Sequence, residues 1–328
     1  MFRHRNEYPV EGTLPAFDGA TAWLNSEPLT PEQLRGSVVL ASFGTYTCIN
    51  WIRSLPYVRA WADKYGANGL TVIGVQTPEF EFEGELDDVA RAIKEMDVRY
   101  PLVVDNDYAI WQAFDNHYWP ALYFVDANGE IRHHHFGEGE YTQSERVLQM
   151  LLAEAGHDVD QDLVGIEPDG VEAPADWENL GSFENYVGYG RTSGFASPGG
   201  AVPDGRHIYA PPAGLRTNQW GLSGDWQMGL VAVASHDAGG AISYRFHARD
   251  LHLVMGPAVP QGSVRFQVRL DGSPPDVAHG IDVDAAGNGT ATYRRMYQLI
   301  RQPGPIVDRS FAIEFLDPGV EAFVFTFG

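Results

Sequence analysis

The period of the hydrophobic pattern changes near residue 180, and this change restricts the fold more than any other feature of the sequence. Before it, buried-strand patterns at residues 38–44 and 70–77 alternate with segments whose apolar residues recur three and four positions apart. After it, short alternating runs such as residues 241–256 and 263–272 are separated by turn residues, with no helical pattern between them. The first pattern predicts an α/β domain and the second an all-β sandwich.

The length of the chain agrees with two domains, because 328 residues exceed what one hydrophobic core usually serves. We expect the α/β domain over residues 1–157, with an N-terminal extension at residues 1–34. Residues 158–180 are acidic, contain Pro and Gly, and lack periodicity, which indicates a linker or a segment that wraps the first domain. The predicted sandwich then occupies residues 181–328.

Helical periodicity within the first domain is found over residues 48–65, 84–98 and 142–156. Pro56 lies inside the first of these segments, where it removes one backbone hydrogen bond and predicts a kink. The pair Asn128-Gly129 between two apolar runs predicts a β-hairpin turn.

The composition excludes several classes of function. A formal charge of −22 repels phosphate backbones and anionic lipid surfaces, so we expect neither nucleic-acid nor membrane binding. A single cysteine excludes an intrachain disulfide and a Cys₄ or Cys₂His₂ zinc site. The first residues lack the apolar run of a secretory signal, which favours a cytoplasmic protein with a reduced thiol.

That cysteine, Cys48, stands between a predicted buried strand and a predicted helix. A thiol at this place lies near unpaired backbone N–H groups and the positive end of the helix dipole. Such an environment lowers the pKa of a thiol and increases the share of nucleophilic thiolate. The sequence therefore predicts a reactive cysteine.

Several stretches resemble the soluble C-terminal part of DipZ-type cytochrome c biogenesis proteins: TYTCINW, VIGVQTPEFEFE, YPLVVDNDYAIW and YWPALYFVDANGEIRHHHFGEGEY. Those proteins combine a TlpA-like thioredoxin domain with a β-sandwich that resembles a carbohydrate-binding module of jelly-roll type. Soluble relatives are identified as redoxin or AhpC/TSA-like proteins. The resemblance implies a thioredoxin-like fold and a cis peptide bond before Pro120, packed against Cys48.

The chain departs from this family at one decisive position. Trp51 stands where the family's second cysteine is expected, and the family's membrane electron-transfer domain is absent from the sequence. A dithiol–disulfide cycle within the chain is therefore excluded. Any redox cycle has to pass through a mixed disulfide, a sulfenic acid or a disulfide between two chains.

A peroxiredoxin-like site is the second interpretation of the same segment. Peroxiredoxins carry the pattern P-x-x-x-T-x-x-C, and Thr45 matches its threonine while Ala41 stands at its proline position. Thr45 is expected to donate a hydrogen bond to the Cys48 thiolate under either interpretation.

The remaining candidate site residues each have a structural alternative. Trp51 either shields an oxidised thiol or fills the space of a lost cysteine. Glu79 follows a buried strand and either takes a proton from Cys48 or is a solvated loop acid. The expected site-lining residues are Tyr46, Asn50, Trp51, Glu79 and Trp119, beside the catalytic set Cys48, Thr45 and Pro120.

Three further patterns are better explained without ligands. The histidines of residues 133–135 lack an evident third metal ligand nearby, and residues 282–289 depart from a calcium loop at Ala286. The aromatic residues of the second domain fit either a sugar platform or an ordinary core, and the core is favoured: Tyr186, Tyr189, Tyr209, Trp220 and Trp226. We expect no metal and no cofactor.

These observations lead to two hypotheses of different classes. In the first, the protein is a monothiol oxidoreductase that acts through Cys48 on a small-thiol or protein disulfide or on a peroxide, with an external reductant and an antioxidant role in the peroxide case. In the second, the thioredoxin-like domain is a redox-inactive scaffold, and the β-sandwich binds a partner or a glycan. The sandwich could also form the surface of a homodimer.

Overall fold

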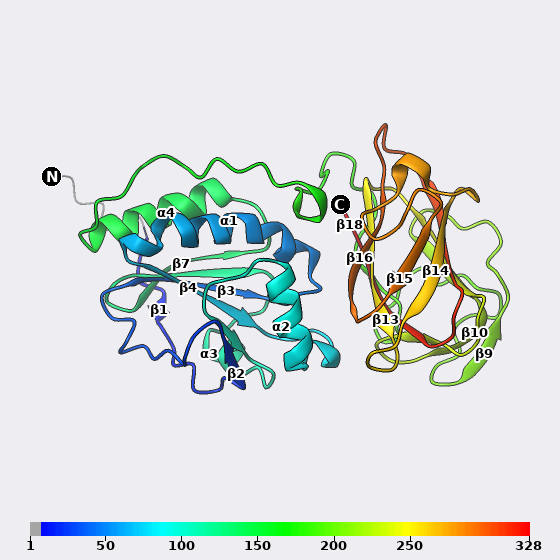
Figure 1. Ribbon diagram of the computed structural model, residues 1–328, viewed down its shortest axis with the longest axis horizontal. Helices are drawn as coiled ribbons and strands as arrows, with labels where there is room; N and C mark the ends of the chain where they lie inside the picture. The colour runs from blue at the N-terminus through cyan, green and yellow to red at the C-terminus, as the bar shows by residue number, and fades with distance from the viewer. Residues whose placement is uncertain (1–7) are drawn as a thin grey trace. The chain divides into compact units, whose positions relative to one another are not determined.

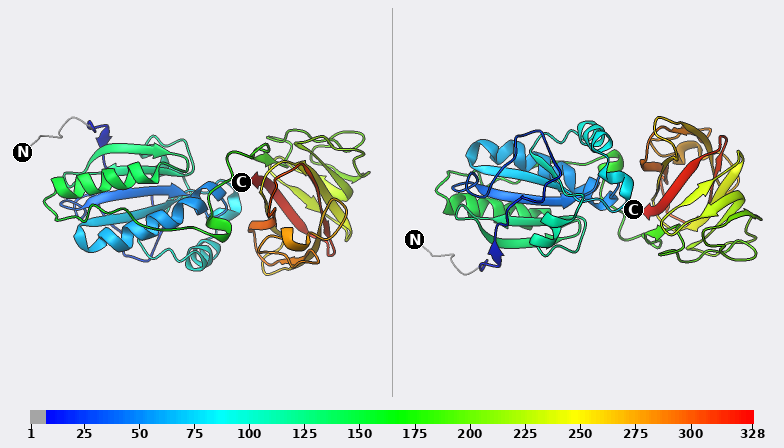
Figure 2. Two further views of the ribbon diagram at one scale, coloured as in Figure 1. Left: turned by 90° about the horizontal axis from the view of Figure 1, so that it is seen from above. Right: turned by 90° about the horizontal axis from the view of Figure 1, so that it is seen from below.

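The computed structural model describes residues 8–328, which form two compact units (Figures 1 and 2). Along the chain, the boundary between the units falls between Ala173 and Pro174. Residues 1–7 of the predicted N-terminal extension lie outside the described residues. In the described part of the chain no helix is both long and apolar enough to cross a membrane.

The first unit is built on a seven-stranded sheet with the order β1-β7-β6-β3-β4-β5-β2. Strands β3, β4 and β5 run parallel to one another, whereas β6 and β7 run antiparallel to their neighbours. This is the α/β architecture that the sequence predicts. The strands are β1 (Gly12–Thr13), β2 (Ala22–Leu24), β3 (Val38–Gly44), β4 (Leu70–Gln76), β5 (Leu102–Val104), β6 (Ala121–Val125) and β7 (Glu130–Phe136).

Helices cover both faces of this sheet (Figure 1). The α-helices are α1 (Ile49–Tyr65), α2 (Leu86–Glu95), α3 (Ala109–Ala113) and α4 (Tyr141–Glu154), and the 3₁₀ turns are η1 (Gly66–Asn68), η2 (Glu81–Gly84) and η3 (Gly170–Glu172). Helices α1 and α4 lie side by side, joined by a hydrogen bond of 2.6 Å from the Tyr65 hydroxyl to Glu145. Ile110 of helix α3 and its C-cap residue Phe114 belong to the apolar cluster on the other face. The helix predicted over residues 84–98 is shorter than expected, because η2 precedes it.

The segment after α4 wraps the first unit up to Ala173. The backbone N–H of Val164 donates to the buried Glu145 carboxylate at 3.0 Å. Farther along, Arg59 of α1 forms two hydrogen bonds of 2.8 Å with Glu172. Much of the predicted linker is therefore held against the first unit by specific contacts.

The second unit is a curled antiparallel sheet, as the all-β prediction requires. Its strand order is β15-β14-β17-β12-β10-β11-β18-β13-β16, with β8 beside β18 and β9 beside β10. The strands are β8 (Asn185–Tyr186), β9 (Arg206–Tyr209), β10 (Gln219–Met228), β11 (Val233–Ser235), β12 (Gly240–Phe246), β13 (Asp250–Pro257), β14 (Val264–Leu270), β15 (Asn288–Ala291), β16 (Arg295–Arg301), β17 (Arg309–Phe315) and β18 (Val320–Phe327), with the 3₁₀ turn η4 (Asp276–Ala278).

Strand β10 makes the sheet continuous around the core. Its first half pairs with β12 and its second half with β9 and β11. Gly224 lies where the partners change and has a φ of +90°, a conformation that glycine adopts without strain. The two layers expected of a sandwich are therefore joined through one bent strand.

Aromatic side chains fill the interior of this second unit. Tyr209, Trp220 and Trp226 are buried in its apolar cluster, Tyr186 is also buried, and Tyr189 packs against the cluster from a half-buried position. These are the residues for which the sequence leaves a sugar platform or a core open. Their burial assigns them to the core.

Candidate active site

Four loops of the first unit meet at one edge of its sheet. Because β3 and β4 are parallel, the residues that follow Gly44 and Gln76 leave the sheet at the same edge. Because β6 is antiparallel to β3, with Phe43 opposite Ala121, the segment that precedes β6 ends at this edge too. The loop after β5, which starts at Asp105, joins them. This convergence brings the predicted site segments together from distant parts of the sequence.

Cys48 is the N-cap residue of the 17-residue helix α1 and is half-buried. Its N–H donates to the carbonyl of Thr45 at 3.0 Å, and its own carbonyl accepts the N–H of Ile52 at 3.0 Å. No acidic residue lies in the first turn of α1, so no carboxylate there offsets the positive end of the helix. The predicted strand–cysteine–helix arrangement is confirmed.

Trp51 occupies the fourth position of the motif and packs against the end of β3. Only 2% of Trp51 is exposed. A methyl group built on Gly44 would lie 2.0 Å from Cδ1 of the indole, so the ring fills the space beside this glycine. The indole N–H is buried and has no hydrogen-bond partner among the described residues. The indole of Trp51 therefore fills the space beside the end of β3, three residues after Cys48.

Glu83 lies beneath the loop that carries Cys48, and sequence analysis did not identify it. Its side chain is fully buried. The hydroxyl of Thr47 donates to its Oε1, while the N–H groups of Glu79 and Phe80 donate to its Oε2 at 2.5 and 2.8 Å. Thr47, the residue before Cys48, is thus hydrogen-bonded directly to the buried carboxyl of Glu83.

Burial raises the pKa of Glu83 to about 7, although hydrogen bonds from Thr47, Phe80 and Thr45 oppose the shift. The carboxyl therefore changes its protonation state near neutral pH. Thr45 is fully buried, and its hydroxyl also accepts a hydrogen bond of 2.9 Å from Gln76. Thr45 thus belongs to the same polar cluster as Glu83.

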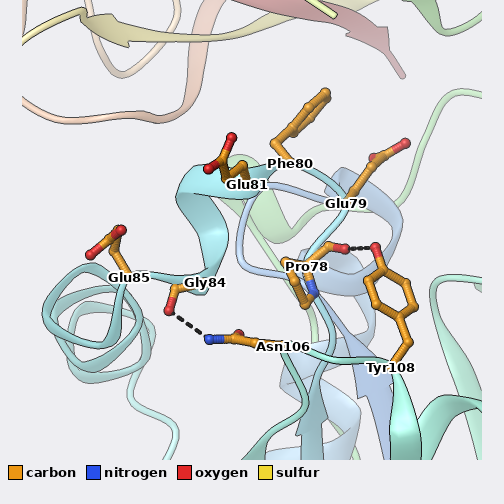
Figure 3. Close-up of a pocket in the computed structure, with 8 residues that line it drawn as sticks. All are labelled: Pro78, Glu79, Phe80, Glu81, Gly84, Glu85, Asn106 and Tyr108. Atoms are coloured by element: carbon orange, nitrogen blue, oxygen red, sulfur yellow. Dashed lines mark hydrogen bonds between the residues drawn. The ribbon is translucent and has the colours of Figure 1, made fainter. Parts of the chain in front are cut away.

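Glu79 lies in the loop that follows β4, four residues before Glu83. A pocket of about 420 Å³ opens there (Figure 3). Its walls are braced by hydrogen bonds from the Tyr108 hydroxyl to the Pro78 carbonyl and from Asn106 to the Gly84 carbonyl. The lining residues are Pro78, Glu79, Phe80, Glu81, Gly84, Glu85, Asn106 and Tyr108. Glu79 is half-buried, so the carboxyl enclosed beneath the Cys48 loop belongs to Glu83 instead.

The segment before β6 forms the other side of the site. The peptide bond between Trp119 and Pro120 is cis, as the resemblance implies. The indole N–H of Trp119 donates to the Thr77 carbonyl at 3.0 Å, and the Gly137 N–H donates to the Pro120 carbonyl at 2.8 Å. Pro120 is therefore held by the loops that follow β4 and β7.

The other predicted lining residues lie on the same loop and helix. Tyr46 is fully buried, and its ring lies 6.4 Å from that of Phe82 in an edge-on arrangement. Asn50 is half-buried in the first turn of α1. Tyr46 thus contributes to the packing beneath the site, while Asn50 lies near its rim.

Protein groups interact with side chains of the two segments that resemble metal-binding patterns, residues 133–135 and residues 282–289. His134 lies 2.7 Å from Glu11, and burial lowers the pKa of His133. Asp282 pairs with Arg295 at 2.5 Å, and Asp284 accepts the Asn288 N–H at 2.8 Å within a turn. Among the described residues, no group of three His, Cys, Asp or Glu side chains is arranged to hold a metal ion.

Comparison with family models divides the chain as the structure does. Residues 10–134 match the AhpC/TSA family, and residues 182–328 match the thioredoxin-like C-terminal domain. The chain is 36% identical over 268 residues to the protein DipZ of Mycobacterium tuberculosis. This match covers 80% of the chain but only 37% of the length of DipZ.

Two further similarities concern the first unit. A solution structure of a thioredoxin-like protein in its oxidised form is 33% identical, with a TM-score of 0.41, and the match covers 44% of this chain and 96% of that one. The thiol-disulfide oxidoreductase YkuV of Bacillus subtilis is 34% identical over 142 residues, which are 43% of this chain and 95% of YkuV. The chain therefore belongs to the family of thioredoxin-like thiol-disulfide oxidoreductases.

Proposed function

We propose that the protein is a monothiol oxidoreductase in which Cys48 is the nucleophile. The observation that supports this most directly is the position of the half-buried thiol at the N-terminus of α1, with a buried carboxyl of raised pKa beneath its loop. Helix N-termini stabilise thiolates, and perturbed carboxyls of this kind gather at reactive sites. In this proposal Pro120, whose peptide bond to Trp119 is cis, shapes the substrate groove beside the thiol.

In the proposed reaction the Cys48 thiolate attacks one sulfur of a disulfide R–S–S–R′. The S–S bond breaks, R′S⁻ leaves, and a mixed disulfide forms between Cys48 and R. A second thiolate from a small thiol or another protein then attacks the R sulfur and releases Cys48 as thiolate. The external thiol is required because Trp51 replaces the resolving cysteine. Dependence on external thiols favours a reducing compartment such as the cytoplasm.

Glu83 is proposed as the acid–base group of this site. Its pKa of about 7 allows it to give a proton to the leaving thiolate and to take one from an incoming thiol near neutral pH. Thr47, the residue before Cys48 in the chain, donates its hydroxyl to this carboxyl. Glu79, in the loop that follows β4, remains the alternative acid.

Reduction of a peroxide is the competing reaction at the same thiol. It would convert the thiolate to a sulfenic acid, with release of an alcohol or water. One external thiol would then displace the sulfenic oxygen as water and form a mixed disulfide, and a second would restore Cys48 as the two external thiols form their own disulfide. The redox-inactive scaffold is the competing function of another class, and it predicts an inert thiol.

The test is the rate at which Cys48 reacts with the neutral disulfide 2,2′-dithiodipyridine as a function of pH. We expect one equivalent of pyridinethione, a titration midpoint below the free-thiol value of about 8.5, and no reaction of Cys48→Ser. The Glu83→Gln variant should lose the part of the pH–rate profile that changes near pH 7. The Glu81→Gln variant, which changes an exposed glutamate two residues away, should retain it. If Cys48 in the folded protein does not react with 2,2′-dithiodipyridine, the result would support the redox-inactive scaffold. A sulfenic acid trapped by dimedone after one equivalent of peroxide would favour the peroxidase reaction.

A further inference from the structure

A buried ion pair joins α1 to the loop that follows β7. Nη1 of Arg53 lies 3.1 Å from Oε1 of Glu138, and the two side chains are only 2% and 8% exposed. The rings of Tyr57 and Tyr141 stack nearby, with centroids 3.7 Å apart. Burial raises the pKa of Tyr141, and the charges of both Arg53 and Glu138 also act on this hydroxyl.

The geometry of this pair is poor for stability alone. It has one N–O contact in place of the two that make arginine–carboxylate pairs strong. Nε of Arg53 is buried without a hydrogen-bond partner among the described residues. Burial also raises the pKa of Glu138, against the opposing effect of Arg53. Removing two charges from water often offsets their mutual attraction, so an apolar pair could replace them without loss of stability.

The pair connects the two sides of the site. Arg53 lies in α1, five residues after the N-cap Cys48, so the guanidinium and the thiol belong to one rigid element. Glu138 directly follows Gly137, whose N–H donates to the carbonyl of Pro120. The path from thiol to helix, ion pair, glycine and proline therefore links the two sides of the site, and its last step, the hydrogen bond between Gly137 and Pro120, continues the pairing of β6 and β7.

We propose that Arg53 and Glu138 are positioning residues that set the separation between Cys48 and the Trp119–Pro120 segment. This role rests on the proposed function of Cys48 as a nucleophile. We expect a peptide disulfide to lie against the Trp119–Pro120 segment while the thiol attacks it, so that its reaction depends on the separation of the two. A small reagent meets only the thiol, whose helix-terminal environment moves with α1.

The test compares two reagents on the full chain. The variant Arg53→Met/Glu138→Leu replaces the ion pair by apolar side chains, and Arg59→Met/Glu172→Leu removes another ion pair of α1 as the matched control. Iodoacetamide reports the intrinsic reactivity of Cys48 against pH. A neutral peptide disulfide, made from acetylated and amidated tetrapeptides, reports the reaction that needs both sides of the site.

We expect the Arg53→Met/Glu138→Leu variant to react with the peptide disulfide about tenfold more slowly. Its iodoacetamide midpoint should stay at the wild-type value and its rate within about twofold. If a folded variant reacts more slowly with both reagents to the same extent, or reacts with both at the wild-type rate, the positioning role is overturned and the proposed function of Cys48 is not. A wild-type thiol inert to iodoacetamide would overturn the proposed function and this role with it. If the double variant does not fold, Glu138→Gln carries the same comparison with the same criteria.

Discussion

The carboxyl groups of the two units respond to their surroundings in opposite ways. Among the described residues, burial raises the pKa of three carboxyls in the first unit: Glu83, Asp105 and Glu138. Hydrogen bonds from neighbouring groups lower the pKa of four carboxyls in the second: Asp225, Asp284, Asp308 and Asp317. The three carboxyls with a raised pKa are enclosed in the first unit, whereas the four with a lowered pKa are paired near the surface of the second.

This difference distinguishes carboxyls that are placed to take part in a reaction from carboxyls that keep the surface of the protein charged and soluble. Glu83 and Asp105 lie where loops converge on the edge of the sheet that carries Cys48, and enclosed carboxyls with raised pKa values are typical of reactive sites. Asp317 instead accepts three hydrogen bonds from the side chain and backbone of Arg265 at 2.7 to 2.9 Å. Such exposed pairs contribute little to stability. Reactivity is therefore expected in the first unit.

The largest effect should come from the tryptophan that packs beneath the site. Trp51→Ala should lower the free energy of unfolding by about 3–5 kcal/mol, as large-to-small core changes do, and should accelerate alkylation of Cys48. Trp226→Ala in the second core should destabilise similarly and leave alkylation unchanged. Urea unfolding and iodoacetamide labelling measure both. Accelerated labelling in both variants would break the contrast between the units.

Gly44→Ala sharpens this test, because its new methyl would overlap the indole. We expect a loss of about 1–3 kcal/mol in the wild-type background from overpacking. The same substitution should cost less when Trp51 is already alanine. A double-mutant cycle measured by urea unfolding gives the coupling, and strict additivity would show that the ring and the glycine do not constrain each other.

The next effect is a pH-dependent one at Glu83. Its pKa rises from 4.5 to about 7 on folding, so the folded state binds more protons between these values. Stability relative to Glu83→Gln should therefore fall as pH rises from 5 to 8, by on the order of 3 kcal/mol. Urea titrations at four pH values measure this slope. A difference between the two proteins that is constant across the range would contradict the raised pKa.

A smaller effect on the free energy of unfolding is expected at Glu145, which holds the wrapping segment after α4 against the first unit. Glu145→Ala leaves the Tyr65 hydroxyl and the Val164 N–H without their buried acceptor, which should cost about 1–3 kcal/mol. Glu167→Ala, at an exposed position of the same segment, should leave the unfolding midpoint unchanged. Equal midpoints for both variants would mean that the segment is a loose linker.

The smallest effect should come from the second unit. Arg265 lowers the pKa of Asp317 to about 2, so this pair contributes stability above the unfolded pKa of 3.8 and loses it as pH falls through about 2. Because the pair is exposed, Asp317→Asn should not change the unfolding midpoint measurably between pH 5 and 8. A loss as large as that of Glu145→Ala would erase the distinction between the units.

Local patterns were sufficient to predict the framework of the first unit. The strand expected over residues 38–44 is β3, and the helix expected over residues 48–65 is α1 with Cys48 at its N-cap. Both follow from hydrophobic periodicity, which is a property of neighbouring residues. The change of period near residue 180 likewise predicted the all-β unit, although not the bend at Gly224 that joins its layers.

Four glutamates show what such patterns leave open. Glu79, Glu81, Glu83 and Glu85 follow one another at every second position, and nothing in their spacing distinguishes them. Sequence analysis selected the first because it lies nearest the strand end. The turn η2 instead directs the third inward, under Thr47, and leaves Glu81 and Glu85 exposed.

The amino-acid order alone therefore determined the elements, their sequence along the chain and the place of the thiol at a helix N-terminus, since each depends on residues a few positions apart. Folding in three dimensions decided which carboxyl is enclosed, that Trp51 packs on Gly44, and that Arg53 meets a glutamate 85 positions away. The physical reason is that burial and charge pairing depend on which distant segments the sheet brings together. Hydrophobic period, by contrast, is present in the chain before it folds.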